Sequence, residues 1–309
     1  MSDEFSTHPS WKQVGNFMVS GGLFLDVIFT SACDCSCPYC IARTKEFARE
    51  DRAAWEEGLR DAFRLFDIRD VIILGGEATV DPDFFGKLNF LEGLMENCTA
   101  DRLILTTNGN RLRDPGFLNG ILDSRIDSVN LSVMHYDQAL NDRLFGRSTL
   151  TKPEISRIHA ALRERGKTLR INVNVWRGNL DTPEEMDRFT EAFAGCCDAV
   201  KFTPLMVTDM FGTRDEVTAF TRAHAIPEQE IAALWDRFAE RHILKQRVSQ
   251  VLGFVDYAEA EAFGQQVILK YAQVEDKYDR ETVIPTLKLY PNGCLSNEWS
   301  FTRDIRDRI

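Results

Sequence analysis

The sequence predicts an α/β fold: a partial (βα)6 TIM-like barrel with a small C-terminal α+β cap. Two observations support it. Six strand-like segments occur in series, and helical patterns separate them. Several of these strands are near-continuous apolar runs, as is typical of parallel strands buried on both faces. The predicted strands cover residues 23–30, 71–74, 102–107, 128–134, 169–176 and 199–205.

The helical segments are identified by apolar residues that recur at helical spacing. One stripe runs through Trp55, Leu59, Phe63 and Phe66. Similar stripes lie within residues 155–162 and 186–193. Such stripes pack against a core, and we assign no chemistry to them.

The chain divides into three segments. Residues 1–22 are polar and are predicted to be an irregular lead-in, residues 23–210 the barrel, and residues 211–309 a helix and hairpin cap. In the last third, residues 206–226 are predicted to be a loop and 227–244 an amphipathic helix.

Two strands, 266–275 and 283–290, are predicted near the C-terminus. A hairpin turn at 291–293 follows them and precedes Cys294. We expect this segment to form an antiparallel cap over the open edge or mouth of the barrel, because an unpaired edge strand invites unwanted pairing.

Composition narrows the class of protein. The 309 residues are 44% hydrophobic, which is ample for a large core, and their net charge is −11. Without a basic block, nucleic acid is not an expected partner. Neither a long apolar span nor a secretory signal is found, so we expect a cytoplasmic protein with no membrane partner. The eight cysteines do not form the regularly spaced pairs of a disulfide framework, which fits a reducing compartment.

The most informative stretch is a cysteine-rich loop after the first predicted strand. Cys33, Cys37 and Cys40 form a C-x-x-x-C-x-x-C pattern, so three thiolates can converge on one metal centre. Three is one fewer than a four-iron cluster needs, which leaves one iron open to a small molecule.

Other interpretations of the loop remain. A structural zinc site takes four closed ligands, usually from two knuckles, and no second knuckle follows, although Cys35 could serve as a makeshift fourth ligand. A disulfide is disfavoured in a reducing compartment. An electron carrier or redox sensor, the second functional class, would be expected to hold its cluster with a fourth cysteine.

The spacing, with Tyr39 before the last cysteine, resembles that of the radical SAM superfamily, in particular the radical enzymes of molybdenum-cofactor biosynthesis. The resemblance implies a [4Fe–4S] cluster on Cys33, Cys37 and Cys40. S-adenosyl-L-methionine (SAM) would chelate the fourth iron and be cleaved reductively to a 5′-deoxyadenosyl radical that abstracts hydrogen. The remaining cysteines are too few for an auxiliary cluster, so we expect one cluster only.

The resemblance also implies cofactor-binding residues, and in such barrels these lie at the C-terminal ends of the strands. Gly75, Gly76 and Glu77 match a motif that contacts the methionyl amino group of SAM, and glycines allow close approach of the backbone. Thr107, at the end of the third predicted strand, is a candidate contact with cofactor or substrate.

Two further strands supply cofactor candidates by resemblance. Ser132 corresponds to a serine that contacts the ribose or carboxylate of SAM, and Asn172 to an asparagine on its carboxylate. Asn172 and Asn174 share one face of a strand, where a polar lumen explains both amides. Tyr39 and Ile41 are candidates for the adenine side.

Two residues are candidates for direct roles with the substrate. His135 follows Ser132 closely and could contact substrate. Cys294 could donate a hydrogen atom to a substrate radical, as a cysteine does in some epimerases of the superfamily, although a structural role is also open for both.

The sequence thus predicts an enzyme that abstracts hydrogen from a small, natural-product-type molecule, with a peptide as the alternative substrate. We expect flavodoxin or ferredoxin to reduce the cluster. The small-molecule preference depends on the lack of a leader-binding extension and of auxiliary cluster motifs in this sequence.

Overall fold

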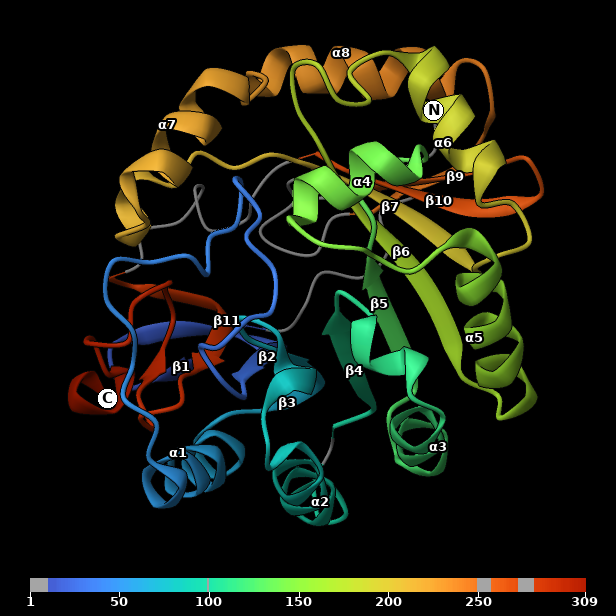
Figure 1. Ribbon diagram of the computed structural model, residues 1–309. Coiled ribbons are helices and arrows are strands. Elements are labelled where there is room, and N and C mark those ends of the chain that lie inside the picture. The colour runs from blue at the N-terminus through green and yellow to red at the C-terminus, as the bar shows by residue number, and fades with distance from the viewer. Residues whose placement is uncertain (1–10, 99, 249–256, 272–280) are drawn as a thin grey trace.

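The computed structural model describes residues 11–98, 100–248, 257–271 and 281–309, which surround one curved sheet (Figure 1). Its twelve described strands are β1 Trp11–Val14, β2 Phe17–Ile28, β3 Ile68–Leu74, β4 Arg102–Thr107, β5 Ser128–Ser132, β6 Thr168–Val175, β7 Ala199–Pro204, β8 Ile243–Val248, β9 Tyr257–Ala262, β10 Gln265–Lys270, β11 Val283–Leu289 and β12 Leu295–Ser296. They are ordered β12-β11-β2-β3-β4-β5-β6-β7-β10-β9-β8, and β1 pairs with β2.

The six predicted barrel strands are confirmed as β2 to β7, and each pairs in parallel with the next. The predicted segment 102–107 coincides with β4. The largest difference is at β2, which begins at Phe17 instead of residue 23. Gly21 and Gly22 lie inside this strand, and glycines weaken the apolar pattern by which a strand is identified.

Helices cover the outer side of the sheet, where α1, α2, α3 and α5 form an arc in Figure 1. The helix bounds are α1 Arg52–Leu65, α2 Phe84–Met95, α3 Pro115–Asp123, α4 Gln138–Phe145, α5 Lys152–Glu164, α6 Pro183–Ala192, α7 Asp215–His224 and α8 Glu228–Ala239. Asp51 caps α1 by accepting a hydrogen bond from the amide of Ala54 at 3.0 Å. The apolar stripe of α1 buries Trp55 and Leu59 in the main core, which also includes Leu25 of β2.

The C-terminal residues protect both edges of the six-stranded core, but not as a purely antiparallel cap. β10 pairs in parallel with β7, and β11 pairs in parallel with β2. Only β9, β8 and β12 add antiparallel pairs, and β12 follows the predicted hairpin turn. The edges are therefore covered by continuing the barrel sheet itself. The part of the predicted strand 266–275 beyond residue 271 lies outside the described residues.

Two local expectations were wrong. Residues 11–22 are not irregular: β1 and β2 form a hairpin whose two-residue turn is Gly15-Asn16, with Gly15 at φ 56°. A Gly-Asn turn between apolar segments is a hairpin pattern that the polar flanks obscured. The predicted loop 206–226 contains α7, which buries Val217 and Thr221. Residues 1–10 of the lead-in lie outside the description.

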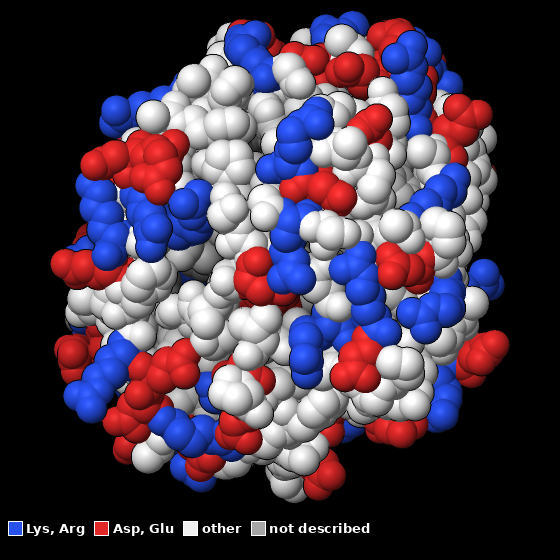
Figure 2. All heavy atoms as spheres, viewed as in Figure 1, with Lys and Arg blue, Asp and Glu red and all other residues white. Residues whose placement is uncertain are grey.

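The surface carries mixed charge. Over the face seen in Figure 2, basic side chains are interspersed with acidic ones, unlike the continuous basic stripe that follows a nucleic-acid backbone. Among the described residues, no helix combines the length and the apolar character needed to cross a membrane.

Candidate functional site

A cavity of about 440 Å³ opens at the C-terminal ends of the parallel strands. The sequence predicts eleven residues for the cluster and the cofactor, and all of them line it. They are Cys33, Cys37, Tyr39, Cys40, Ile41, Gly75, Gly76, Glu77, Thr107, Ser132 and Asn172. They come from the loop after β2 and from the ends of β3, β4, β5 and β6. Residues far apart in sequence thus meet where a barrel of this kind places its chemistry.

The cysteine loop is fastened to the C-terminal end of α4. The amide of Ser36 donates to the carbonyl oxygen of Phe145 at 2.9 Å. Gly146 ends α4 at φ 73°, and a Cβ there would lie only 2.0 Å from Ser36 Oγ. Arg43 Nη1 donates to the carbonyl oxygens of Ser36 and Cys37 at 3.1 and 3.2 Å. These contacts fix the backbone that carries the thiols.

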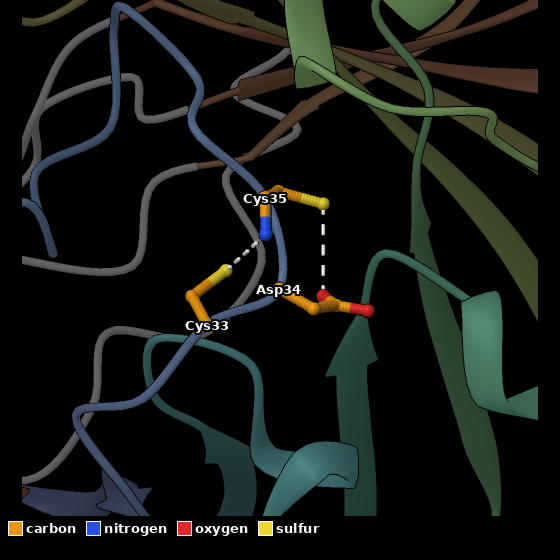
Figure 3. A group of neighbouring side chains, drawn as sticks. All are labelled: Cys33, Asp34 and Cys35. Atoms are coloured by element: carbon orange, nitrogen blue, oxygen red, sulfur yellow. Dashed lines mark hydrogen bonds between the residues drawn. The ribbon is translucent and has the colours of Figure 1, made fainter.

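A second set of contacts ties the loop to the end of β4 through Asp34. Asn108 Nδ2 donates to Asp34 Oδ1 at 2.6 Å and to Cys35 Sγ at 3.2 Å. Arg147 donates to the other carboxylate oxygen of Asp34. Figure 3 shows the Cys35 amide donating to Cys33 Sγ at 3.4 Å, while Cys35 Sγ donates to Asp34 Oδ1 at 3.7 Å. The loop is therefore held by side chains as well as by its own backbone.

The spacing of the sulfur atoms bears on which metal centre fits. Cys33, Asp34 and Cys35 offer ligand atoms that all lie within 4.8 Å of one another, and this is the one such group found among the described residues. At least one pair among the three motif thiols is therefore more than 4.8 Å apart. A four-iron cluster takes one thiolate per iron, so a wider spread suits it. The donor set around the cavity fits the cluster.

The thiols differ in their electrostatic surroundings. Hydrogen bonding with the Cys35 side chain lowers the pKa of Cys33 and of Cys37. Burial raises the pKa of Cys40 to about 12. Because metals bind the deprotonated thiolate, the iron must displace a proton from Cys40 on binding.

The Gly-Gly-Glu turn packs closely against the segment that enters the cysteine loop. A Cβ on Gly75 would lie 2.5 Å from the carbonyl oxygen of Thr30, and one on Gly76 would lie 2.3 Å from that of Ala32. In the same place Gly76 N donates to Thr30 O at 2.9 Å, and Glu77 N donates to Ala32 O at 2.8 Å. Only glycine allows this approach, so the motif couples β3 to the loop after β2.

The Glu77 carboxylate is buried and holds the turn together. It accepts hydrogen bonds from Thr79 N and Oγ1 at 3.2 and 2.7 Å, from Thr107 Oγ1 at 2.7 Å and from Asn108 N at 2.6 Å. Burial raises its pKa. Since the Thr107 hydroxyl also accepts from Gly109 N at 2.9 Å, both side chains are engaged with protein groups. The backbone of Gly75 and Gly76 remains as the part of this turn that can meet a ligand.

Ser132 and Asn172 are register partners on β5 and β6, so they lie side by side on one face of the sheet. Arg170 Nε donates to Asn172 Oδ1 at 3.0 Å, which leaves the Asn172 amide nitrogen as a donor. No hydrogen-bond partner is found for the Ser132 hydroxyl among the described residues. Two donors next to each other suit a carboxylate. Asn174 lines the same cavity, as a polar lumen requires.

Tyr39 supplies an aromatic wall to the cavity. Its ring lies 5.2 Å from that of Trp176 and 6.5 Å from that of Phe220, measured between centroids. The phenol oxygen is buried, and among the described residues it has no hydrogen-bond partner of ordinary geometry, although the Cys37 thiol is near enough to interact with it. Burial raises the pKa of this phenol well above its usual value. A buried polar atom at a cavity is left for a ligand to satisfy. Ile41, the other adenine-side candidate, also lines the cavity.

The two substrate candidates are elsewhere: neither His135 nor Cys294 is among the described residues that line the cavity. His135 Nδ1 accepts from the amide of Asp137 at 2.9 Å. Cys294 is buried in a small apolar cluster with Ile28 and Tyr290. The structure thus gives both residues local contacts, and their catalytic roles remain predictions.

Several lining residues were not identified from the sequence. Asp26, Lys201, Thr203, Lys270 and Trp299 all border the cavity. The sequence did contain one signal, because Lys201 interrupts the apolar run of a buried central strand. A charge at such a position is costly unless it faces a polar space.

Comparison with known proteins agrees with this geometry. The family model of the radical SAM superfamily matches residues 27–190, more than half of the chain. The GTP 3′,8-cyclase of Paracoccus denitrificans is 25% identical over 251 residues, which cover 79% of this chain and 67% of that protein. The same-named protein of Rhodopseudomonas palustris strain TIE-1 is 30% identical over 159 residues, 50% of this chain and 45% of its own. The chain spans about half the length of most of these relatives.

Solved structures share the fold. SuiB of Streptococcus suis bound to S-adenosylmethionine superposes with a TM-score of 0.58 at 17% identity, over 92% of this chain and 61% of that one. The protein anSMEcpe with bound AdoMet superposes with a TM-score of 0.52 at 15% identity, over 71% and 58%.

The family match covers the cysteine loop and the turns at the ends of β3, β4 and β5, and the fold is that of a partial barrel. This chain therefore belongs to the radical SAM superfamily, and it is an enzyme whose cofactors are a [4Fe–4S] cluster and S-adenosylmethionine.

Proposed function

We propose that this enzyme abstracts hydrogen from a small, natural-product-type molecule that enters the cavity at the mouth of the barrel. When bound, the cluster and SAM supply the radical for that step. The observation that supports the proposal is the single cavity that brings together the cysteine loop, the Gly-Gly-Glu turn and the polar strand ends.

The roles of the protein groups follow from their positions. Cys33, Cys37 and Cys40 hold the iron, on a loop whose backbone is fixed from two sides. The backbone of Gly75 and Gly76 meets the methionyl amino group of SAM. Ser132 and Asn172 bind the carboxylate of SAM, and Tyr39 contacts its adenosyl part. Glu77 and Thr107 support the cofactor site indirectly, by holding the Gly-Gly-Glu turn in place.

A small molecule is preferred to a peptide on the names of the sequence relatives. The sequence relatives are named for GTP, which is a small molecule. The alternative is a peptide, because a structural neighbour is described as bound to the precursor peptide SuiA.

The class of reaction is tested by anaerobic reconstitution with iron and sulfide, reduction with dithionite, and measurement of 5′-deoxyadenosine formed from SAM. We expect Cys33→Ala, Cys37→Ala and Cys40→Ala to lose the cluster and to reduce product to background. Cys98→Ala is the matched control, because its thiol is half-buried and bonds only the Met95 carbonyl among the described residues. A colourless protein that binds zinc instead would refute the proposal.

The class of substrate is tested with the reconstituted enzyme and a low-molecular-weight metabolite pool. We expect the pool to accelerate formation of 5′-deoxyadenosine, and this acceleration to survive prior protease treatment of the pool. Loss of the acceleration after protease treatment would establish the peptide alternative. Replacing dithionite by flavodoxin or ferredoxin tests the proposed reductant.

A further inference from the structure

The lumen beside the cofactor residues is lined by basic side chains from neighbouring strands. Lys201 of β7 pairs in register with Asn172 of β6 on one side and with Ile268 of β10 on the other. Lys270 lies two residues beyond Ile268 and therefore on the same face. Both lysines line the cavity that contains the cysteine loop. Two ammonium groups thus face the space next to the cofactor site.

Further charges surround Lys201, and most of them are positive. The positive charges of Arg170 on β6 and of Lys270 repel the Lys201 ammonium group and lower its pKa. The carboxylate of Asp26 on β2 attracts it and has the opposite effect. Asp26 pairs in register with Lys288 of β11, whose side chain is fully buried. The single carboxylate thus faces a second lysine as well as Lys201.

Lys201 itself lacks a partner. No hydrogen bond or ion pair is found for its ammonium group among the described residues. Burial and its cationic neighbours lower the pKa of this lysine well below its usual value. A cation in such surroundings costs free energy unless an anion compensates it. Asn172, one strand away on one side, is assigned with Ser132 to the cofactor carboxylate, whereas Lys270 lies one strand away on the other side, so an anion between the two lysines would be a separate group.

We propose that the substrate carries an anionic group, a carboxylate or a phosphate, which binds between Lys201 and Lys270 in the lumen of the barrel. The inference rests on the proposed function and specifies its substrate class. The anion would orient the rest of the substrate toward the mouth, where the cysteine loop lies. A fixed ionic contact at one end of a substrate is an efficient way to hold a C–H bond in place for abstraction.

The test measures thermal stability of the reconstituted holoenzyme with excess SAM, so that the cofactor carboxylate occupies its own site. The probes are inorganic pyrophosphate and succinate, each compared with sodium chloride at equal ionic strength. We expect one of the two anions to raise the melting temperature saturably, and its identity distinguishes phosphate from carboxylate. The absence of a saturable effect for both anions would overturn the inference.

Variants locate the site. Lys201→Met and Lys270→Met should each weaken the effective anion by about tenfold or more, because a charge-assisted hydrogen bond is lost. Lys152→Met is the control, since Lys152 is exposed on α5 and loses the same charge. Full anion response in both lumen variants would refute the site.

A structural role for Lys201 predicts a different result. If Lys201 awaits an anion, Lys201→Met should leave the melting temperature of the anion-free protein unchanged or raise it, because the change removes a partly buried cation that forms no ion pair among the described residues. A lower melting temperature of that variant would overturn the inference. Formation of 5′-deoxyadenosine from SAM in the absence of substrate separates the proposed function from the proposed anion site. If 5′-deoxyadenosine forms but neither anion changes the melting temperature, the anion site is wrong and the proposed function stands.

Discussion

Gly76→Ala tests whether the Gly-Gly-Glu turn acts by its close contact with the cysteine loop. The added Cβ would lie 2.3 Å from the carbonyl oxygen of Ala32 and 2.6 Å from that of Ser31. Both are backbone atoms, so the loop must move by about 1 Å to reach ordinary van der Waals distance. Overpacking of this kind costs about 1–3 kcal/mol of unfolding free energy. We expect the melting temperature to fall by roughly 2–6 °C.

The displacement should also affect the metal centre, because the shifted backbone leads directly into Cys33. We expect Gly76→Ala to hold less iron per chain after anaerobic reconstitution, measured by iron analysis and by absorbance of the cluster. Gly93→Ala is the matched control: it lies inside α2, and an added Cβ there meets nothing within 4 Å. The control should gain up to about 1 kcal/mol of helix stability. Wild-type stability and iron content in Gly76→Ala would refute the reasoning.

Three further predictions follow. Tyr39→Phe removes a buried hydroxyl that has no hydrogen bond of ordinary geometry among the described residues, so the melting temperature of the cofactor-free protein should change little, while calorimetry should show weaker SAM binding; unchanged binding would contradict the contact. A hydrogen bond from Arg113 lowers the pKa of Glu154 from 4.5 to about 2 in the folded protein. The carboxylate therefore stabilises the fold at pH values above 4.5, and this stabilisation is lost as the pH falls toward 2. Glu154→Ala should therefore lower the free energy of unfolding by about 1 kcal/mol at pH 7, because solvent screens this partly exposed pair. Chemical denaturation should show the gap between variant and wild type narrowing below pH 4.5. Cys294→Ala should mainly loosen packing against Tyr290, and product should still form at the wild-type rate; loss of product with intact SAM cleavage would instead establish the hydrogen-donor role.

The barrel strands were predictable because several are near-continuous apolar runs and helical patterns separate all six. The cysteine loop, the Gly-Gly-Glu turn, Ser132 and Asn172 were identifiable by resemblance, and their common cavity followed from placing each at a strand end. This works because parallel strands end at one edge of the sheet, so short motifs far apart in sequence meet without any detailed knowledge of packing.

What the sequence did not reveal depends on long-range pairing. Nothing local in residues 283–289 says that they pair in parallel with a strand more than two hundred residues earlier. The roles of Glu77 and Thr107 are a second example, because their mutual hydrogen bond exists only once β3 and β4 are adjacent. The lack of a partner for Lys201 is likewise a property of the assembled lumen.

The pairing of β2 with β11 has a consequence for biogenesis. The strand that leads into the cysteine loop obtains its outer neighbour only when residues 283–289 have left the ribosome. Until then one side of that strand lacks its hydrogen-bonding neighbour, so the strand from which the loop starts is not yet fixed in the sheet. We therefore expect iron to be loaded after synthesis of the chain is nearly finished. Cells short of iron would accordingly accumulate full-length apoprotein instead of stalled fragments.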